Sequence, residues 1–146
     1  MSQNIKANNQ PYFTQMLNAM GTNGIQLRKS RRSYSGQFQI VDSWPEKIDS
    51  AVNIIKSKRL VSVDITLKGH KAADQFEKLK ENQTNFNQIV GGEVQWIDDL
   101  PKERQIVVFL KANPTEKKDW PRQHAWLIAK LAAFRVAFEL FKDELV

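Results

Sequence analysis

Residues 120–146 read WPRQHAWLIAKLAAFRVAFELFKDELV, and this stretch decides the fold. Its large apolar residues recur at alternating steps of four and three, which is the spacing of one face of an α-helix. They are Leu127, Leu131, Phe134, Phe138, Phe141 and Leu145. Asp119 is expected to cap the helix, and Pro121 suits its first turn, where the N–H that proline lacks would have no partner. A helix with such a face needs a sheet or other helices to lie on.

Length and composition indicate one domain with its own core. A chain of 146 residues can bury about 70% of its unfolded surface, so we expect a single domain over residues 1–146, with residues 1–9 disordered. The absence of cysteine excludes disulfides, thiolate metal sites and cysteine nucleophiles. Neither a signal peptide nor the roughly 18 apolar residues of a membrane span is evident, so we expect a cytoplasmic protein with no membrane contact.

The apolar pattern upstream predicts an α+β fold with an antiparallel sheet of about five strands. The predicted helices are an N-terminal helix from Pro11 to Met20, one helix inserted between strands at Lys71–Val90, and the long C-terminal helix packed on the sheet. Strands are predicted at Gln37–Ile40 as an edge strand, at Ala51–Ile55, at Arg59–Lys68, at Glu93–Ile97 and at Ile106–Leu110. The segment at Ala51–Ile55 also fits a helix.

Two of these strands carry most of the pattern. Between Arg59 and Lys68, Val61, Val63, Ile65 and Leu67 alternate with polar residues, which predicts one buried face and one polar face. The run Ile106–Leu110 is apolar at every position, which predicts a central strand covered on both faces.

The positive charge lies near the N-terminus. The net charge is +6, and residues 1–60 hold nine lysines and arginines against three acids, whereas residues 61–146 hold thirteen of each. Arg28, Lys29, Arg31 and Arg32 form a cluster beside Tyr34, with Trp44 nearby. Such a basic segment could contact phosphates while an aromatic ring stacks on a base, or it could bind an acidic protein. The alternative is a solvated loop.

Clustered carboxylates with a lysine would indicate a metal-dependent nuclease. Asp64 and Lys68 share the polar face of one predicted strand, and other acids stand at Glu93, Asp98 and Asp99. No acid-x-Lys pair lies on a strand, because Glu116, Lys117 and Lys118 fall in a predicted loop. The simpler interpretation of Asp64 is a solvated ion pair with a cation on the next strand.

No catalytic residue, metal site or cofactor is predicted. His70 and His124 are the only histidines, and because nothing in the sequence brings them together, we expect capping or surface roles. Of Trp96, Trp120 and Trp126, at least two are expected in the core, whereas Trp44 is expected at a surface.

The stretch from Arg59 to Phe141 resembles the bacterial family DUF4268, a domain of unknown function. The resemblance is carried by the strand RLVSVDITL, the segment GGEVQW and the helix opening DWPRQHAWL, and mainly by Trp96, Leu100, Pro101, Trp120, Trp126 and Phe138. It implies a setting near DNA metabolism or defence, because family members occur alone or behind nuclease-like domains. It implies no reaction. Around residues 22–50 the sequence departs from the family pattern, so the basic cluster gains no support from it.

We therefore expect a non-enzymatic accessory or protein-interaction domain of a bacterial DNA-related or defence system. Its contact residues would be Arg28, Lys29, Arg31, Arg32, Tyr34 and Trp44. A protein partner is expected, and a homodimer is possible. The first alternative is nucleic-acid binding through the Arg28–Arg32 loop, and the second is a divergent metal-dependent nuclease.

Overall fold

The computed structural model describes residues 2–21, 26–28, 37–41 and 47–145, with side chains for residues 11–21 and 47–145. Four α-helices run along this part of the chain: α1 (Ser2–Met20), α2 (Ala72–Lys80), α3 (Gln83–Val90) and α4 (Trp120–Phe141). Short 3-10 turns follow β3 (Lys56–Lys58), precede α4 (Lys117–Asp119) and extend it (Lys142–Leu145). None of the described helices is long and apolar enough to cross a membrane.

The strands form one antiparallel sheet in the order β1-β2-β3-β4-β6-β5. They are β1 (Gln26–Arg28), β2 (Gln37–Val41), β3 (Ile48–Ile55), β4 (Leu60–Lys68), β5 (Gln95–Ile97) and β6 (Glu103–Lys111). The α+β class and the antiparallel sheet are confirmed. The described sheet has six strands rather than about five, because β1 is only three residues long and shows no alternation in sequence.

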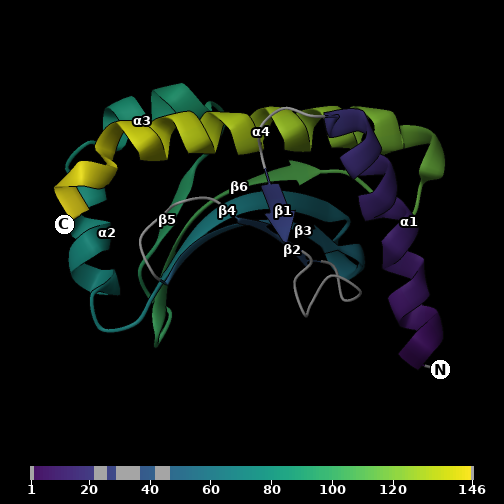
Figure 1. The fold of residues 1–146 in the computed structure, drawn as a ribbon, viewed down its shortest axis with the longest axis horizontal. Coiled ribbons are helices and arrows are strands. Elements are labelled where there is room, and N and C mark those ends of the chain that lie inside the picture. The colour runs from purple at the N-terminus through teal and green to yellow at the C-terminus, as the bar shows by residue number, and fades with distance from the viewer. Residues whose placement is uncertain (1, 22–25, 29–36, 42–46, 146) are drawn as a thin grey trace.

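Helix α4 lies lengthwise across the curved sheet with α3 beside it, whereas α1 and α2 stand near its two ends (Figure 1). The predicted apolar face of α4 is confirmed, since every member is buried: Leu127, Leu131, Phe134, Phe138, Phe141 and Leu145. It packs on Val61, Val63, Ile65 and Leu67 of β4 within one apolar cluster. Burial of these side chains is the main stabilising term, at about 1.5–3 kcal/mol for each large residue.

Several predicted boundaries differ from the structure. The first helix begins at Ser2 rather than near Pro11 and carries this proline inside it. The segment predicted as one helix at Lys71–Val90 is two, α2 and α3, which meet at Glu81–Asn82. At this break Asn82 leaves the helical conformation, with φ −109° and ψ 24°, and its Nδ2 donates to Glu144 Oε2 at 2.8 Å. The predicted strand Gln37–Ile40 is present as β2, but it is not an edge strand, because β1 pairs with its outer side.

The polar face of β4 is not solvated as predicted. Ser62, Asp64 and Thr66 are buried, as are the apolar residues between them. The register places Asp64 between Ala51 of β3 and Val107 of β6. Strand β6 is buried on both faces only at Ile106–Val108, since Phe109 and Leu110 are half-buried. The sheet therefore buries polar side chains at its centre, and their hydrogen bonds must be satisfied within the protein.

Candidate functional site

The basic cluster predicted from the sequence lies mostly outside the residues that the structure describes. Arg28 ends β1, where its backbone is in register with Gln39 of β2. Lys29, Arg31, Arg32, Tyr34 and Trp44 fall in the stretches 29–36 and 42–46, which are not described. Their role as contact residues therefore stays a prediction.

Asp64 is the buried carboxylate of the sheet, with 4% of its surface exposed. Asn53 Nδ2 donates a hydrogen bond to one carboxylate oxygen at 2.7 Å, and Thr66 Oγ1 donates to the other at 2.8 Å. The expected ion pair with a neighbouring cation is wrong, because these partners are neutral, and Lys68 instead lies 3.9 Å from Asp49. Burial raises the pKa of Asp64 to about 6, although the hydrogen bonds from Asn53 and Thr66 lower it.

A buried acid with this pKa can exchange a proton near neutral pH, which general acids and bases require. Its partners are an amide and a hydroxyl, which fix its orientation within the sheet. Across residues 2–21, 26–28, 37–41 and 47–145, no group of three or more histidine, aspartate or glutamate side chains could hold a metal ion. Asp64 accordingly forms a polar network with Asn53, Thr66 and Ser62, whose hydroxyl accepts from Asn53 at 3.2 Å.

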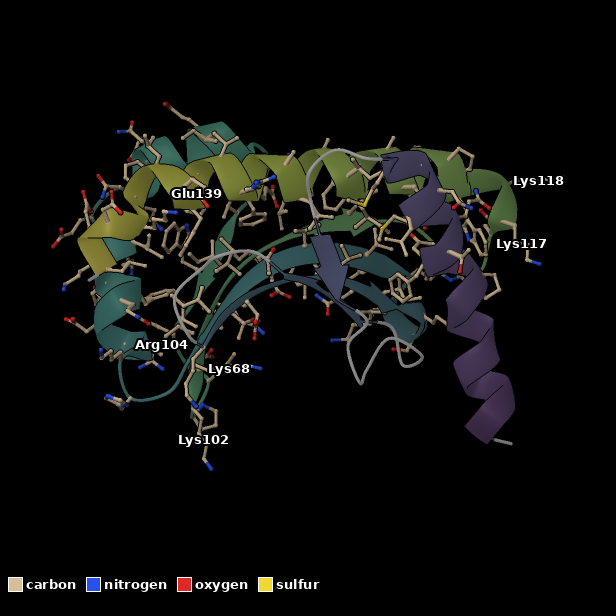
Figure 2. All side chains as sticks on the ribbon, in the orientation of Figure 1. Lys68, Lys102, Arg104, Lys117, Lys118 and Glu139 are labelled. Carbon is tan, nitrogen blue, oxygen red and sulfur yellow. The ribbon has the colours of Figure 1, made fainter. Side chains whose placement is uncertain are left out.

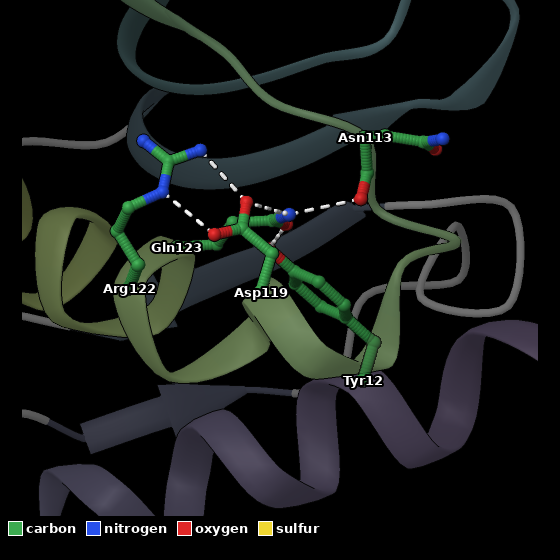
Figure 3. Close-up of polar contacts among 5 residues, drawn as sticks. All are labelled: Tyr12, Asn113, Asp119, Arg122 and Gln123. Atoms are coloured by element: carbon green, nitrogen blue, oxygen red, sulfur yellow. Dashed lines mark hydrogen bonds and ion pairs between the residues drawn. The ribbon is translucent and has the colours of Figure 1, made fainter.

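The start of α4 holds a second polar network, which joins α4 to α1 (Figure 3). Tyr12 Oη donates to Gln123 Oε1 at 2.8 Å, and Gln123 Nε2 donates to Asn113 O at 2.9 Å. Asp119 caps no backbone N–H of the helix, contrary to the prediction. Its carboxylate instead accepts two hydrogen bonds of 2.7 Å from Arg122 and one of 3.0 Å from Gln123. These bonds lower the pKa of Asp119 to about 2.

His124 is buried beside this network, and its expected surface role is wrong, although His70 is exposed. Its ring packs edge-on against Tyr12 with centroids 4.4 Å apart, and Trp120 lies at 5.9 Å. Neither ring nitrogen has a hydrogen-bond partner among the residues that the structure describes. Burial lowers the pKa of His124 to about 4, so the ring is neutral at physiological pH.

Tyr12 should hold α1 in place through its hydroxyl. We expect Tyr12→Phe to lower the free energy of unfolding by about 1–2 kcal/mol, because Gln123 Oε1 would remain buried without its donor. Urea unfolding at neutral pH measures this change. The matched control is Thr14→Ala at an exposed position of the same helix. Equal stability of the Tyr12→Phe and control proteins would contradict this role.

The tryptophans divide between core and margin. Trp120 is buried, and its Nε1 donates to Pro114 O at 2.8 Å. Trp96 is half-buried between the rings of Phe76 and Phe86, and Nε1 donates to Asn87 Oδ1 at 2.8 Å. Trp126 is half-buried against the same apolar cluster. These three side chains therefore serve packing.

A group of exposed cations at one end of the sheet was not predicted. The turn between β3 and β4 carries Lys56, Lys58 and Arg59, all exposed. Arg59 has a left-handed backbone, with φ 53° and ψ 52°, a conformation that costs a non-glycine residue about 1–2 kcal/mol. Strained residues of this kind cluster at functional sites.

The loop between β6 and α4 brings further cations to the same end. Lys111 is the register partner of Leu60, and Ala112 N donates to Arg59 O at 3.0 Å. Lys117 and Lys118 follow in the loop and project at the end of the molecule where α4 begins (Figure 2). They line an open groove with Thr115, Glu116, Asp119 and Arg122. We call the six residues the basic rim: Lys56, Lys58, Arg59, Lys111, Lys117 and Lys118.

The basic rim keeps its charge available. No ion pair joins any of its members to an acid within the described part of the chain. The nearby carboxylate of Asp119 forms its ion pair with Arg122. Only Glu116 adds an unpaired negative charge in the loop. In the sequence the signals were the runs KSKR at residues 56–59 and KK at 117–118. Neither run indicates that the other lies at the same end of the sheet.

The chain matches one family model, described as Domain of unknown function (DUF4268), over residues 8–142. The match extends the resemblance of residues 59–141 to almost the whole chain, including the residues around the basic cluster. No curated protein and no solved structure showed significant similarity to this chain. The chain therefore belongs to the DUF4268 family.

Proposed function

We propose that this protein is a non-enzymatic accessory domain that binds the phosphate backbone of nucleic acid. The observation that carries the proposal is the basic rim, whose six exposed cations come from two segments at the same end of the sheet. Phosphate contacts by lysine and arginine supply most of the affinity of binding without sequence preference. The setting implied by the family resemblance, near DNA metabolism or defence, is one where such binding is useful.

The predicted basic cluster would be a second contact of the same kind. Its first residue, Arg28, ends strand β1 of the same sheet. Tyr34 and Trp44 would add stacking surfaces for unpaired bases. The two contacts are separable, because the rim variant below leaves residues 28–44 unchanged.

The test is fluorescence anisotropy with labelled single-stranded and duplex DNA of about 20 nucleotides, titrated from about 50 mM to about 200 mM salt. We expect measurable binding at low salt that weakens as salt is raised. Replacing Lys56, Lys58 and Lys111 with alanine should weaken binding about tenfold and reduce the salt slope by about two to three, because each lysine that contacts a phosphate adds roughly 0.9 to it.

The matched control replaces Lys68, Lys71 and Lys102. Lys68 and Lys102 lie toward the other end of the sheet (Figure 2), and Lys71 lies just after the end of β4. It changes the net charge by the same amount, so a loss confined to the rim variant supports the rim. Equal loss in both variants would show that only overall charge matters. Loss confined to variants at Arg28, Lys29, Arg31 and Arg32 would place the contact in the predicted cluster and overturn the rim. Absence of binding at low salt would overturn the function.

Protein binding is the second candidate function, and one observation favours it. Val136 and Leu140 of α4 are 58% and 63% exposed, and they are the large apolar side chains that the described surface exposes most. Apolar surface of this kind marks interaction sites.

A further inference from the structure

Helix α4 is apolar on the side that faces away from the sheet as well as on its core face. Ala125, Ala129, Ala132, Val136 and Leu140 are all exposed. They succeed one another at steps of four, three, four and four, so they form a single stripe along the helix. We call these five residues the outer face of α4. A helix with a second apolar stripe opposite its core face normally packs against another element there, and no part of the chain that the structure describes covers this stripe.

The shape of the outer face suits another helix. Its three alanines allow a second backbone to approach closely, and Val136 and Leu140 can pack beside such a partner. The stripe extends over 16 residues, or about 24 Å at 1.5 Å per residue. One helix of similar length, laid along α4, would cover it.

The charges at the ends of α4 identify the partner. Arg122 pairs with Asp119, and Lys142 pairs with Glu139. Apart from these pairs, the exposed charges at the start of the helix are Lys117 and Lys118, with Glu116. At its end they are Asp143 and Glu144. This order is unfavourable within one helix, since the macrodipole prefers acids at the N-terminus and bases at the C-terminus. A helix of the same sequence, placed antiparallel, brings the lysines of each copy next to the acids of the other.

We propose that the protein forms a twofold symmetric dimer through the outer faces of two antiparallel α4 helices. The midpoint of the stripe, beside Ala132, lies on the twofold axis. At each end of the stripe, Ala125 of one copy therefore faces Leu140 of the other. Such an interface is self-complementary, as a twofold dimer requires. One pair of helices buries an area near the lower limit for stable complexes, so dissociation in the micromolar range is expected.

Sedimentation velocity from about 1 to about 200 µM measures the association, because the dimer fraction rises with concentration. We expect the mass to rise from one chain toward two. Val136→Glu with Leu140→Glu should remain a single chain throughout. The control with Ala73→Glu and Gln88→Glu, at exposed helical positions elsewhere, should dimerise as the unaltered protein does. A single chain at every concentration of the unaltered protein would overturn the proposal, as would a dimer that survives the Val136 and Leu140 changes.

Cysteine cross-linking tests the antiparallel arrangement, because the chain contains no cysteine of its own. Ala132→Cys should form disulfide-linked dimers by itself. Proteins carrying Ala125→Cys and Leu140→Cys should cross-link when mixed, and each alone should not. Cross-linking of Ala125→Cys with itself would indicate a parallel pair and overturn the arrangement. None of these substitutions changes the basic rim, and the rim variant replaces Lys56, Lys58 and Lys111 rather than Lys117 and Lys118, which lie at the dimer contact. Failure of this proposal and failure of nucleic-acid binding are therefore measured separately.

Discussion

Replacing Asp64 with asparagine is expected to stabilise the protein at pH 8 and to leave its stability at pH 4 nearly unchanged. The folded state holds the proton of Asp64 up to a pKa of about 6, against an ordinary value of 3.8. The contribution of Asp64 to the free energy of unfolding is therefore fully present below about pH 4 and is lost as pH rises through 6. The loss is about 3 kcal/mol, at about 1.4 kcal/mol per unit of pKa. The amide of asparagine does not ionise, so the variant avoids this loss.

The hydrogen bonds around Asp64 allow this exchange. The carbonyl of asparagine can accept from Asn53, as one carboxylate oxygen does at 2.7 Å. Its amide group would stand where the other oxygen accepts from Thr66 at 2.8 Å, and the threonine hydroxyl can turn to accept instead. No buried partner is left unsatisfied, so little of the expected gain of about 3 kcal/mol at pH 8 should be lost.

Urea unfolding at about pH 4 and about pH 8 measures the effect as the difference from the unaltered protein at each pH. The control is Asp74→Asn on α2, whose side chain is 75% exposed and whose ion pair with Lys78 is worth at most about 1 kcal/mol. The raised pKa of Asp64 would be refuted if the variant were less stable than the unaltered protein at pH 8. It would also be refuted if the free energy of unfolding changed by the same amount at both pH values.

The elements predicted well from the sequence were those where one face must be apolar. The four-three spacing in α4 and the alternation of Val61, Val63, Ile65 and Leu67 each specify an element and the side that it buries. Strand β1 was missed because three residues are too few to show a period. The division between α2 and α3 was missed because Phe76, Leu79, Phe86 and Val90 keep the same helical phase across it.

The candidate site was less predictable because it depends on contacts between distant segments. The turn that ends at Arg59 and the loop that follows Lys111 come together only through the pairing of β4 with β6, and local sequence does not specify that pairing. The burial of Asp64 likewise depends on what covers the second face of the sheet. A polar residue that alternates with apolar ones normally faces water, so the pattern indicated a solvated side chain.

Asp64 and His124 give opposite dependences of stability on pH in overlapping ranges. Asp64 has a raised pKa and destabilises the fold as pH rises from about 4 to about 6, whereas His124 has a lowered pKa and destabilises it as pH falls from 6.5 to about 4. Their contributions should largely cancel in the unaltered protein. A flat stability profile in this range would therefore conceal two strongly shifted groups, which single variants would reveal.

Replacing His124 with leucine is expected to stabilise the protein at pH 4 by about 3 kcal/mol more than at pH 7. The folded state holds the neutral ring down to a pKa of about 4, against 6.5 ordinarily. The stability that this ring contributes is complete above pH 6.5 and is lost as pH falls to about 4, by about 3 kcal/mol. Leucine has a similar volume and cannot take up a proton, so the variant avoids the loss.

At pH 7 the same substitution should change stability by no more than about 1 kcal/mol, because two effects oppose each other. Leucine removes two buried ring nitrogens that have no partner in the described part of the chain, which is favourable by about 1–3 kcal/mol. It also removes the edge-on contact with Tyr12 at 4.4 Å, which is worth about 0.5–1.5 kcal/mol. Urea unfolding at the two pH values measures the difference, with the exposed His70→Gln as the control. Parallel profiles for His124→Leu and the unaltered protein would mean that His124 takes up its proton equally in both states.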